Sequence, residues 1–491
     1  MLKKVTFLII SQLIIFHIGA LNKMQLSLNS AIELANDSSI AAFQAQNFFL
    51  ASFWDYANFE ASGKPTLRLN TSPISYNRAI NKQFNTVDSS YSYFGQHFLS
   101  SSIGLNLNQN IALTGGSLSV NSDLNRLQNF GSQASTQYSS SPIWIGLNQP
   151  LFAYNSFKWE KKLAPLKYEK AKKEFLTSYE ENASIVVGFF FNLATAEQNF
   201  KIAETNFANA DTLYEIGKKR FEITAITKID LLNLRLELLN SKDQMSVAEN
   251  DLSHARSQFL SFLGLNKDTP LELILPEELP NLIINASKAV ELATSNNPDV
   301  AGFLQKELET NRDMEKVKRE NLPTVSLNAS YGLNKTSDKM ADTYKNLKRQ
   351  ECINLNLSVP LIDWGLRKGR YNLVCKQREA QIASIKQDKI DFEEVVVREI
   401  AVFNIQKSLV QSAKEASNVA NEAFEISKIK FLIGQVDVNN LIIQLDRKDS
   451  TLRNYITALQ AYWTAYYAVR RLTLFDFERN KTLAIDFNRY K

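Results

Sequence analysis

Side chains that could carry out catalysis or bind a metal are scarce in this chain of 491 residues, which contains 3 histidines and 2 cysteines. His17, His97 and His254 do not have the spacing of metal ligands. No glycine-rich phosphate loop or paired-carboxylate site stands out either. The net charge of +5 is spread along the chain without a basic tract. We therefore expect no enzyme activity, no cofactor, no metal site and no nucleic acid partner.

The two cysteines fall in different predicted elements, Cys352 in a strand and Cys375 in a helix. Because these elements diverge, a disulfide between them is disfavoured. We expect two free, buried thiols.

The first 20 residues are typical of a secretory signal peptide. Lys3 and Lys4 precede an apolar run from Val5 to Ile18, which Gly19-Ala20 follows. The run is short for a membrane-spanning helix, and an N-terminal anchor helix is the alternative. No cysteine follows it, so no lipoprotein anchor is predicted. We expect an exported chain that is not held by membrane helices.

One pattern occurs twice along the chain. Lys64 to Asn70 returns as Leu322 to Asn328, 258 positions later (322 − 64), and Asn148 to Phe152 returns as Ser358 to Ile362, 210 positions later (358 − 148). An internal duplication defines the architecture before any single element does. The two distances differ by 48 residues (258 − 210), so the first copy should contain about one extra pair of strands.

Six short segments alternate between aliphatic residues and Asn, Ser, Gly or Arg, which places the two kinds on opposite faces of a sheet. They are Leu67–Asn70, Ile103–Asn108, Leu118–Asn121, Ile143–Asn148, Val325–Tyr331 and Ile353–Val359. A soluble sandwich would alternate in the same way. Three features favour a membrane barrel with a polar lumen instead. They are the export signal, the polar and aromatic flanking segments Asn77–Phe98 and Gln128–Ser141, and a tight turn at Thr114-Gly115-Gly116. We expect this turn at the periplasmic rim.

Six strands are too few to close such a barrel, and an open sheet edge is not viable in lipid. Several chains must therefore share one barrel. Three chains that contribute four to six strands each would give roughly 12 to 18 strands.

Long helices are predicted for most of the remaining chain. Proline is absent between Pro165 and Pro270 and after Pro360. The predicted helices cover about 158–215, 227–263, 288–321, 367–429 and 438–472. These lengths far exceed the usual three or four turns. Their apolar residues recur at three-to-four spacing, as in a coiled coil, so we expect hairpins packed side by side into a cylinder.

The predicted organisation is a signal peptide (1–20), a first repeat (21–264), a linker (265–285) and a second repeat (286–491). Each repeat begins with a helix, for which Ser30 and Ser287 are candidate N-caps. After this helix, strands and a long helical hairpin follow in each repeat. Their predicted ranges are about 65–152 and 158–263 in the first repeat, and about 323–362 and 366–472 in the second, which ends in a short tail.

Taken together, these features resemble the TolC family of outer membrane efflux and secretion channels over nearly the whole mature length. The matching segments are Ala31–Ala35 and Ala289–Ala293, Asn297-Pro298, Lys64-Pro65-Thr66 and Leu322-Pro323-Thr324, Pro150-Leu151-Phe152 and Pro360-Leu361-Ile362, and Arg220-Phe221 and Lys430-Phe431. The resemblance implies a mixed α/β membrane protein with two internal structural repeats. Long antiparallel helical hairpins would form an α-barrel across the periplasm, and strands would contribute to a shared trimeric transmembrane β-barrel.

The resemblance also implies partners and a function. The chain would be a homotrimer in outer membrane lipid of a Gram-negative bacterium, with a periplasmic adaptor (membrane fusion) protein and an inner-membrane pump of RND or ABC type. It would be the passive outer membrane channel of a tripartite efflux system, opened by docking of these partners at the helix tips. One alternative is the channel of a type I protein secretion system. Another is a periplasmic coiled-coil adaptor or scaffold, which would leave the six strands without a purpose.

The family barrel takes four strands from each chain, so the extra pair around Ile103 to Asn121 is a departure. Our hypothesis is that this pair joins the barrel wall and raises the total to roughly 18 strands. A lid folded outside the wall is the alternative.

The resemblance assigns candidate residues at the periplasmic tips of the hairpins. Thr224 replaces the glycine of the family tip in the first copy, and Asn440 replaces the final aspartate in the second. In the family, acidic residues near the second tip line a constriction. This chain has Asn440 and Ile443 at the corresponding positions, and Asp437 or Asp446 could supply the acidic side chain instead. The gate candidates are Asp437, Asn440, Ile443 and Asp230, and the adaptor-contact candidates are Arg220, Phe221, Thr224, Lys430, Phe431 and Gly434. A purely local role is the alternative, in which Gly434 permits a left-handed turn.

Overall fold

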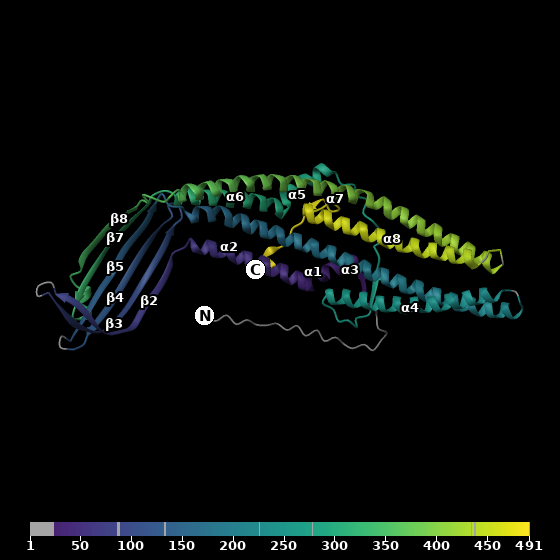
Figure 1. Ribbon diagram of the computed structural model, residues 1–491, viewed down its shortest axis with the longest axis horizontal. Helices are drawn as coiled ribbons and strands as arrows, with labels where there is room; N and C mark the ends of the chain where they lie inside the picture. Colours follow the sequence, from purple (N-terminus) through teal and green to yellow (C-terminus); the bar gives the residue numbers. More distant parts are fainter. Residues whose placement is uncertain are drawn as a thin grey trace.

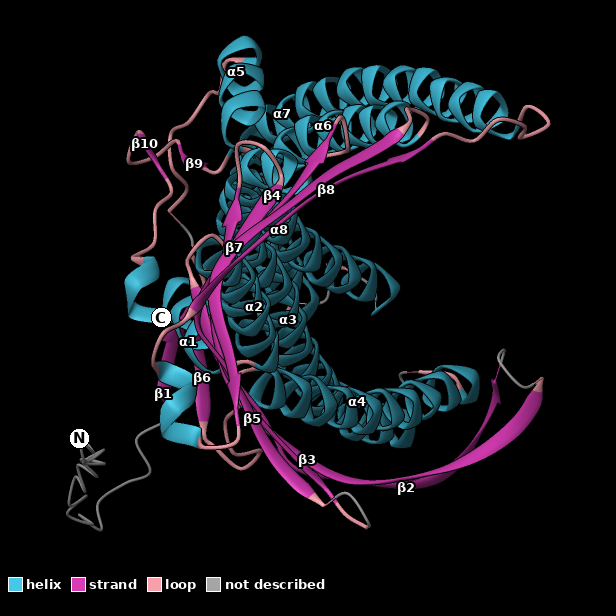
Figure 2. Ribbon diagram, turned by 90° about the vertical axis from the view of Figure 1, so that its left-hand side faces the viewer, coloured by secondary structure: helices cyan, strands magenta, loops and turns pink. Residues whose placement is uncertain are grey.

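The computed structural model describes residues 24–85, 89–131, 134–224, 226–276, 278–433, 435–436 and 438–490. The molecule is long and narrow, with one β-sheet at one end and helices along the rest of its length (Figure 1). Seen along the long axis, sheet and helices follow a common arc (Figure 2). One chain is therefore a curved section of a wall. The predicted signal peptide lies outside the described residues.

Six antiparallel strands form the sheet, in the order β2-β3-β4-β5-β7-β8. They are β2 (Thr66–Asn85), β3 (Ser90–Ile111), β4 (Gly116–Asn129), β5 (Ser135–Leu151), β7 (Thr324–Ser337) and β8 (Lys348–Ser358). Each of the six predicted segments lies in one of these strands to within a residue. The strands are longer than predicted, because much of the polar and aromatic flanking sequence also pairs across the sheet.

The extra strand pair is part of the sheet, because β3 and β4 lie between β2 and β5. This arrangement rules out the alternative of a lid. The turn between β3 and β4 lies at the end of the sheet nearest the helices, where the Asn155 side chain donates a hydrogen bond to the Ala112 carbonyl at 2.9 Å. Asn155 is also the N-cap of the following helix, so the turn and the helix start share one residue.

The β2–β3 hairpin is much taller than the rest of the sheet. Its strands pair from Thr66 opposite Asn108 to Asn85 opposite Ser90, whereas β4 reaches only as far as Phe98. A strand needs about 9–11 residues to cross a bilayer. At 11 residues β8 has this length, and β2, at 20 residues, has nearly twice as many.

Eight α-helices are present in the described part of the chain. They are α1 (Leu28–Ser38), α2 (Ile40–Ser62), α3 (Ser156–Glu222), α4 (Lys228–Phe262), α5 (Ala286–Asn296), α6 (Pro298–Glu320), α7 (Leu366–Leu432) and α8 (Val438–Thr473). The helices α3 and α7 contain 67 residues each and would be roughly 100 Å long if straight. Their equal length in the two repeats agrees with an internal duplication.

Short elements complete the chain. Strand β1 (Met24–Ser27) pairs in parallel with β6 (Leu271–Ile274), and β9 (Phe475–Asp476) pairs with β10 (Lys481–Thr482) in antiparallel fashion. Two 3-10 helices are η1 (Met340–Tyr344) and η2 (Phe487–Tyr490).

Three local predictions were wrong. The N-caps are Ser27 and Asn285 rather than Ser30 and Ser287, because α1 and α5 begin earlier than predicted and these side chains accept the first-turn N–H groups. The predicted helix over 288–321 is two helices, since Pro298 begins α6 and the Asn297 side chain caps it. The thiols are free, as predicted, but they are not buried: Cys352 is exposed and Cys375 half-buried.

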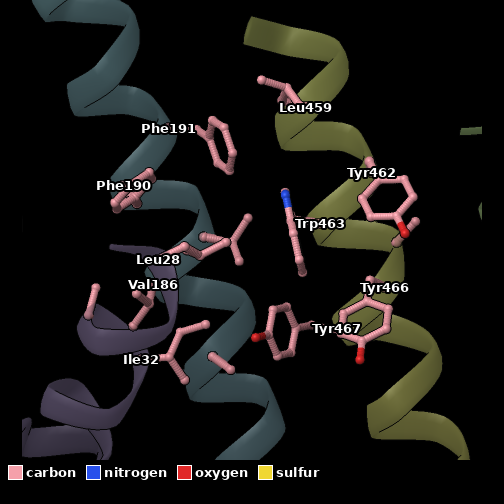
Figure 3. Packing of buried hydrophobic residues seen from close by; sticks show 14 of the residues in the cluster. Leu28, Ile32, Val186, Phe190, Phe191, Leu459, Tyr462, Trp463, Tyr466 and Tyr467 are labelled. Atoms are coloured by element: carbon pink, nitrogen blue, oxygen red, sulfur yellow. The ribbon is translucent and has the colours of Figure 1, made fainter. Parts of the chain in front are cut away.

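The hydrophobic core lies where α1, α3 and α8 meet, about midway along the molecule (Figures 1 and 3). Phe191 of α3 points toward α8, Trp463 of α8 lies between the two helices, and Ile32 of α1 packs beside α3 (Figure 3). Burial of each such side chain contributes about 1.5–3 kcal/mol. This core joins the helices of the first repeat to those of the second.

A buried ionic cluster strengthens the same junction. The Arg470 guanidinium of α8 donates two hydrogen bonds to the Glu180 carboxylate of α3, at 2.8 and 2.9 Å, and a third to Asp476 at 3.1 Å. Buried charges are tolerated only when they are paired, and loss of one partner leaves the other uncompensated. The cluster therefore holds α3, α8 and β9 in one arrangement.

Candidate functional site: the wall and the helix tips

The two faces of the sheet differ sharply in chemistry. On one face Leu107 lies opposite Val120, and Ile145 lies opposite Tyr331. On the other face asparagine, serine and glycine dominate, and asparagine pairs such as Asn148 with Asn328 face each other. Because side chains alternate along a strand, the pattern holds across all six strands. Such a sheet can separate an apolar medium from water.

The sheet has two free edges. Strand β2 pairs only with β3, and β8 pairs only with β7, among the described residues. Unpaired backbone groups at a sheet edge favour pairing with another strand, and they are strongly unfavourable in lipid. The sheet is thus incomplete in a single chain.

The helices follow the same lateral order as the strands that they adjoin. Next to the sheet, contacts run from α2 to α3, from α3 to α6 and from α6 to α7. Farther from the sheet they run from α4 to α3, from α3 to α8 and from α8 to α7. One lateral edge of the chain is therefore formed by β2, α2 and α4, and the other by β8 and α7.

Helix α2 exposes apolar side chains on the face that points away from its own chain. Ile40, Phe43 and Trp54 are 77%, 66% and 59% exposed, whereas Phe49 is 2% exposed. At 100° per residue, Phe49 lies opposite the other three. The exposed residues thus form a stripe, which we call the α2 stripe.

Exposed apolar residues also line α7, on the opposite lateral edge. Leu366 and Leu373 are seven residues apart, as are Ile390 and Val397, and all four are exposed. A seven-residue spacing keeps each pair on one helix face. We call the pair nearest the sheet, Leu366 and Leu373, the α7 stripe. Helix α4 has exposed apolar residues near the tip as well, at Ile229, Leu232, Leu236 and Leu239.

The first helix tip connects α3 to α4 and contains four of the predicted site residues. Arg220 is exposed near the end of α3, and the Phe221 ring contacts the Lys228 ammonium group at 5.3 Å. Thr224 has a φ of 61°. This is the left-handed region, which favours glycine and strains a β-branched residue. The tip therefore keeps the backbone conformation of a glycine turn although the glycine is missing.

Asp230, the fourth of these residues, has a clear local role. It forms a capping box with Thr227: the Thr227 side chain accepts a hydrogen bond from the Asp230 N–H at 3.2 Å, and the Asp230 carboxylate accepts one from the Thr227 N–H at 2.9 Å. The bonds from the Thr227 hydroxyl and N–H lower the pKa of this carboxyl below its ordinary value. Asp230 thus helps to begin α4, and its gating role stays a prediction.

The second tip connects α7 to α8. Gly434 and Asp437 lie outside the described residues. Lys430 and Phe431 belong to the last turn of α7, and Asn440 belongs to the first turn of α8. Ile443 follows one turn later and is 48% exposed. The described candidates of each tip thus lie close together along the chain.

Sequence reasoning missed a buried carboxylate between the hairpins. Asp449 of α8 is 5% exposed, and it accepts a hydrogen bond from the Asn206 side chain of α3 at 3.2 Å. Burial raises the pKa of Asp449 above its ordinary value, although Arg453 and Lys448 act in the opposite direction. No sequence pattern indicates this contact, because Asn206 and Asp449 are 243 residues apart in the chain.

Two further observations concern the described residues as a whole. No group of three or more His, Cys, Asp or Glu side chains in them could hold a metal ion. None of their helices combines the length and apolarity needed to cross a membrane.

Comparison with known proteins identifies the family. The family described as outer membrane efflux protein matches residues 106–265 and 289–473. This chain belongs to that family, and it is a TolC-type outer membrane efflux channel that extends into the periplasm and is not an enzyme. The family forms trimeric channels in tripartite efflux systems.

Solved structures show the same fold. The chain is similar to the CmeC outer membrane channel of Campylobacter jejuni, with 14% identity, 94% of this chain and 88% of that chain covered, and a TM-score of 0.65. It is similar to VceC of Vibrio cholerae (11% identity, 91% and 95% covered, TM-score 0.61). It is also similar to the open state of MtrE of Neisseria gonorrhoeae (13% identity, 91% of this chain and 88% of that chain covered, TM-score 0.58). Among curated proteins, no sequence matches the chain.

Proposed function

We propose that three copies of this chain close one channel in which β2 of each copy pairs with β8 of the next, giving a barrel of roughly 18 strands. The observation that carries the proposal is the open six-stranded sheet, with a free edge on each side and one apolar and one polar face. The apolar face would contact lipid, and the polar face would line the lumen.

The widths of the sheet and of the helical layer support six strands per copy. At a spacing of about 4.8 Å and a tilt of about 40°, six strands cover about 38 Å of a barrel wall. Four helices side by side cover about 36 Å at the usual interaxial distance. The extra strand pair thus lets the barrel match a 12-helix cylinder in circumference.

The exposed stripes support the same closure. Trp54 lies eight residues before the end of α2, and Leu373 lies seven residues after the start of α7. Because both helix ends adjoin the sheet, these residues lie about 12 and 11 Å below it. The α2 stripe of one copy would then meet the α7 stripe of the next at matching heights.

The helix tips would form the periplasmic entrance. A periplasmic adaptor protein, which links the channel to an inner-membrane pump of RND or ABC type, would contact the tips. The contact residues would be Arg220, Phe221, Thr224, Lys430, Phe431 and Gly434. The periplasmic gate would be lined or supported by Asp437, Asn440, Ile443 and Asp230. The exposed Arg220 and the half-buried Phe221 ring of the first tip support a docking role, since arginine and phenylalanine are enriched at interfaces.

Cysteine cross-linking tests the closure. In a background with Cys352→Ser and Cys375→Ser, the pair Trp54→Cys and Leu373→Cys should give covalent trimers on oxidation. Phe49→Cys with Leu373→Cys is the matched control, because Phe49 faces its own chain, and it should give none. If the double variant has the size of a trimer but forms no cross-link, the proposed contact between α2 of one copy and α7 of the next is wrong. Electron cryo-microscopy should show 18 strands, and a 12-stranded wall would refute the barrel.

Export assays test the tips. Bulky substitutions at Thr224 and Arg220 should abolish efflux in cells while the channel still purifies as a trimer. Ile283→Trp, in the exposed connector between the repeats, is the control and should leave efflux unchanged. Unchanged efflux in the tip variants would remove them from the adaptor contact.

A further inference from the structure

An indole and a carboxylate form a pair on the polar face of the sheet. Trp144 of β5 lies between Ile143 and Ile145, whose side chains belong to the apolar face, so its own side chain is on the polar face. Its Nε1–H donates a hydrogen bond of 2.8 Å to the Asp123 carboxylate of β4. The large ring stands out on a face otherwise dominated by Asn, Ser and Gly.

Glycines make room for both members of the pair. A Cβ at Gly332, directly opposite on β7, would collide with the Cβ of Trp144, and one at Gly146 would lie 2.9 Å from the indole. A Cβ at Gly104, opposite Asp123 on β3, would collide with the carboxylate. The indole therefore extends along the wall from Gly146 toward Asp123, with the carboxylate against the bare backbone of the neighbouring strand.

The carboxylate has no cationic partner among the described residues. Arg68 lies on the same face, two strands away, and forms no ion pair with Asp123 in the described sheet. The hydrogen bond from Trp144 orients the carboxylate without neutralising it. A negative charge beside an aromatic ring is the chemistry that recognises a lipophilic cation.

We propose that Trp144 and Asp123 bind lipophilic organic cations on the inner wall of the barrel, with the indole against the apolar part of the ligand and the carboxylate against its charge. The inference rests on the proposed function, because it requires the polar face to line the lumen. Three copies would give three equivalent sites. The channel wall would thereby favour cationic over anionic cargo of the same size.

Two probe ions of nearly equal size and shape test this inference. Tetraphenylphosphonium should bind the detergent-purified trimer saturably in equilibrium dialysis, at about one ion per chain, and tetraphenylborate should not. Asp123→Asn preserves an acceptor for the indole N–H and removes only the charge, so it should weaken binding about tenfold. Trp144→Leu should weaken it to a similar extent. Asp342→Asn is the matched control, because Asp342 is exposed and paired with Lys345 at 3.1 Å, and it should change nothing.

The outcomes separate the inference from the proposed function. Equal binding of the two ions, or full binding by Asp123→Asn, would overturn the cation site. In the cysteine-free background, Asn148→Cys should react with a membrane-impermeant maleimide and Leu147→Cys should not, because they lie on opposite faces. The reverse labelling would refute the proposed orientation of the sheet. Correct labelling without cation binding would refute only the site.

Discussion

Removal of the Trp54 side chain should break the proposed trimer without unfolding the chain. Trp54 is 59% exposed in the single chain and belongs to the α2 stripe. A tryptophan buries up to about 250 Å², so the contact with the next copy would remove about 150 Å² from water. At about 25 cal/mol per Å², this is about 3.8 kcal/mol per contact and about 11 kcal/mol for a closed trimer.

The assay is the temperature at which the trimer dissociates in detergent, followed by gel migration and by analytical ultracentrifugation. Trp54→Ala should lower this temperature strongly or give monomers with unchanged helix content by circular dichroism. Ile283→Ala is the control, because Ile283 is 87% exposed in the connector between the repeats and should not affect the trimer. A Trp54→Ala trimer as stable as the wild type would refute the assignment of the α2 stripe to the interface.

Three further predictions concern the helix tips and the contact between the hairpins. Thr224→Gly should stabilise the first tip by about 1 kcal/mol, because glycine adopts a positive φ without strain. Amide hydrogen exchange around the tip should become slower in this variant. Equal or faster amide exchange would contradict the view that the Thr224 backbone is strained. Asp230→Asn should increase fraying of the first turn of α4. Because the pKa of Asp230 is lowered by folding, its contribution to stability is present above its ordinary pKa and is lost as the pH falls through the folded value, so wild type and variant should exchange alike in acid. Asp449→Asn should raise the thermal midpoint at neutral pH, since the amide keeps a hydrogen-bond acceptor for Asn206 and removes a buried charge. Folding raises the pKa of Asp449, so its favourable contribution is present below the ordinary pKa and is lost as the pH rises through the folded value; the gap between variant and wild type should therefore close in acid, and a gap that is constant with pH would contradict this reasoning.

Much of the architecture could be predicted because strands and helices each repeat apolar residues at a characteristic spacing. Alternation identified all six sheet strands, and the unbroken three-to-four pattern identified the long helices to within a few residues at most ends. The two distances between repeated segments even located an insertion of about two strands. The prediction failed at helix ends such as Ser27 and Asn297, where one side chain that accepts backbone N–H groups decides the boundary.

The site residues were less accessible from the sequence. The tip candidates came from resemblance alone, and Gly434 and Asp437 lie outside the described residues, so the roles of the tip candidates stay predictions. The two repeats are confirmed by the family match, whereas the predicted bounds of the repeats and the linker stay predictions. Asp449 could not be found, because a buried acid on a helix has no signature in one sequence. Trp144 did carry a signal: its position in the alternation puts a large ring on the polar face.

The sequence by itself determined which residues face which side of the sheet and how long the helices are, because both follow from the repeat distances of a regular backbone. Only the tertiary structure decided that β3 and β4 belong to the same sheet as the other four strands, that α3 touches both α6 and α8, and that Trp144 meets Asp123. The last contact lies beside an irregularity in the pairing of β4 with β5, where the register shifts between Asn121 and Asp123. A register shift is a property of two strands together, so neither strand's sequence contains it.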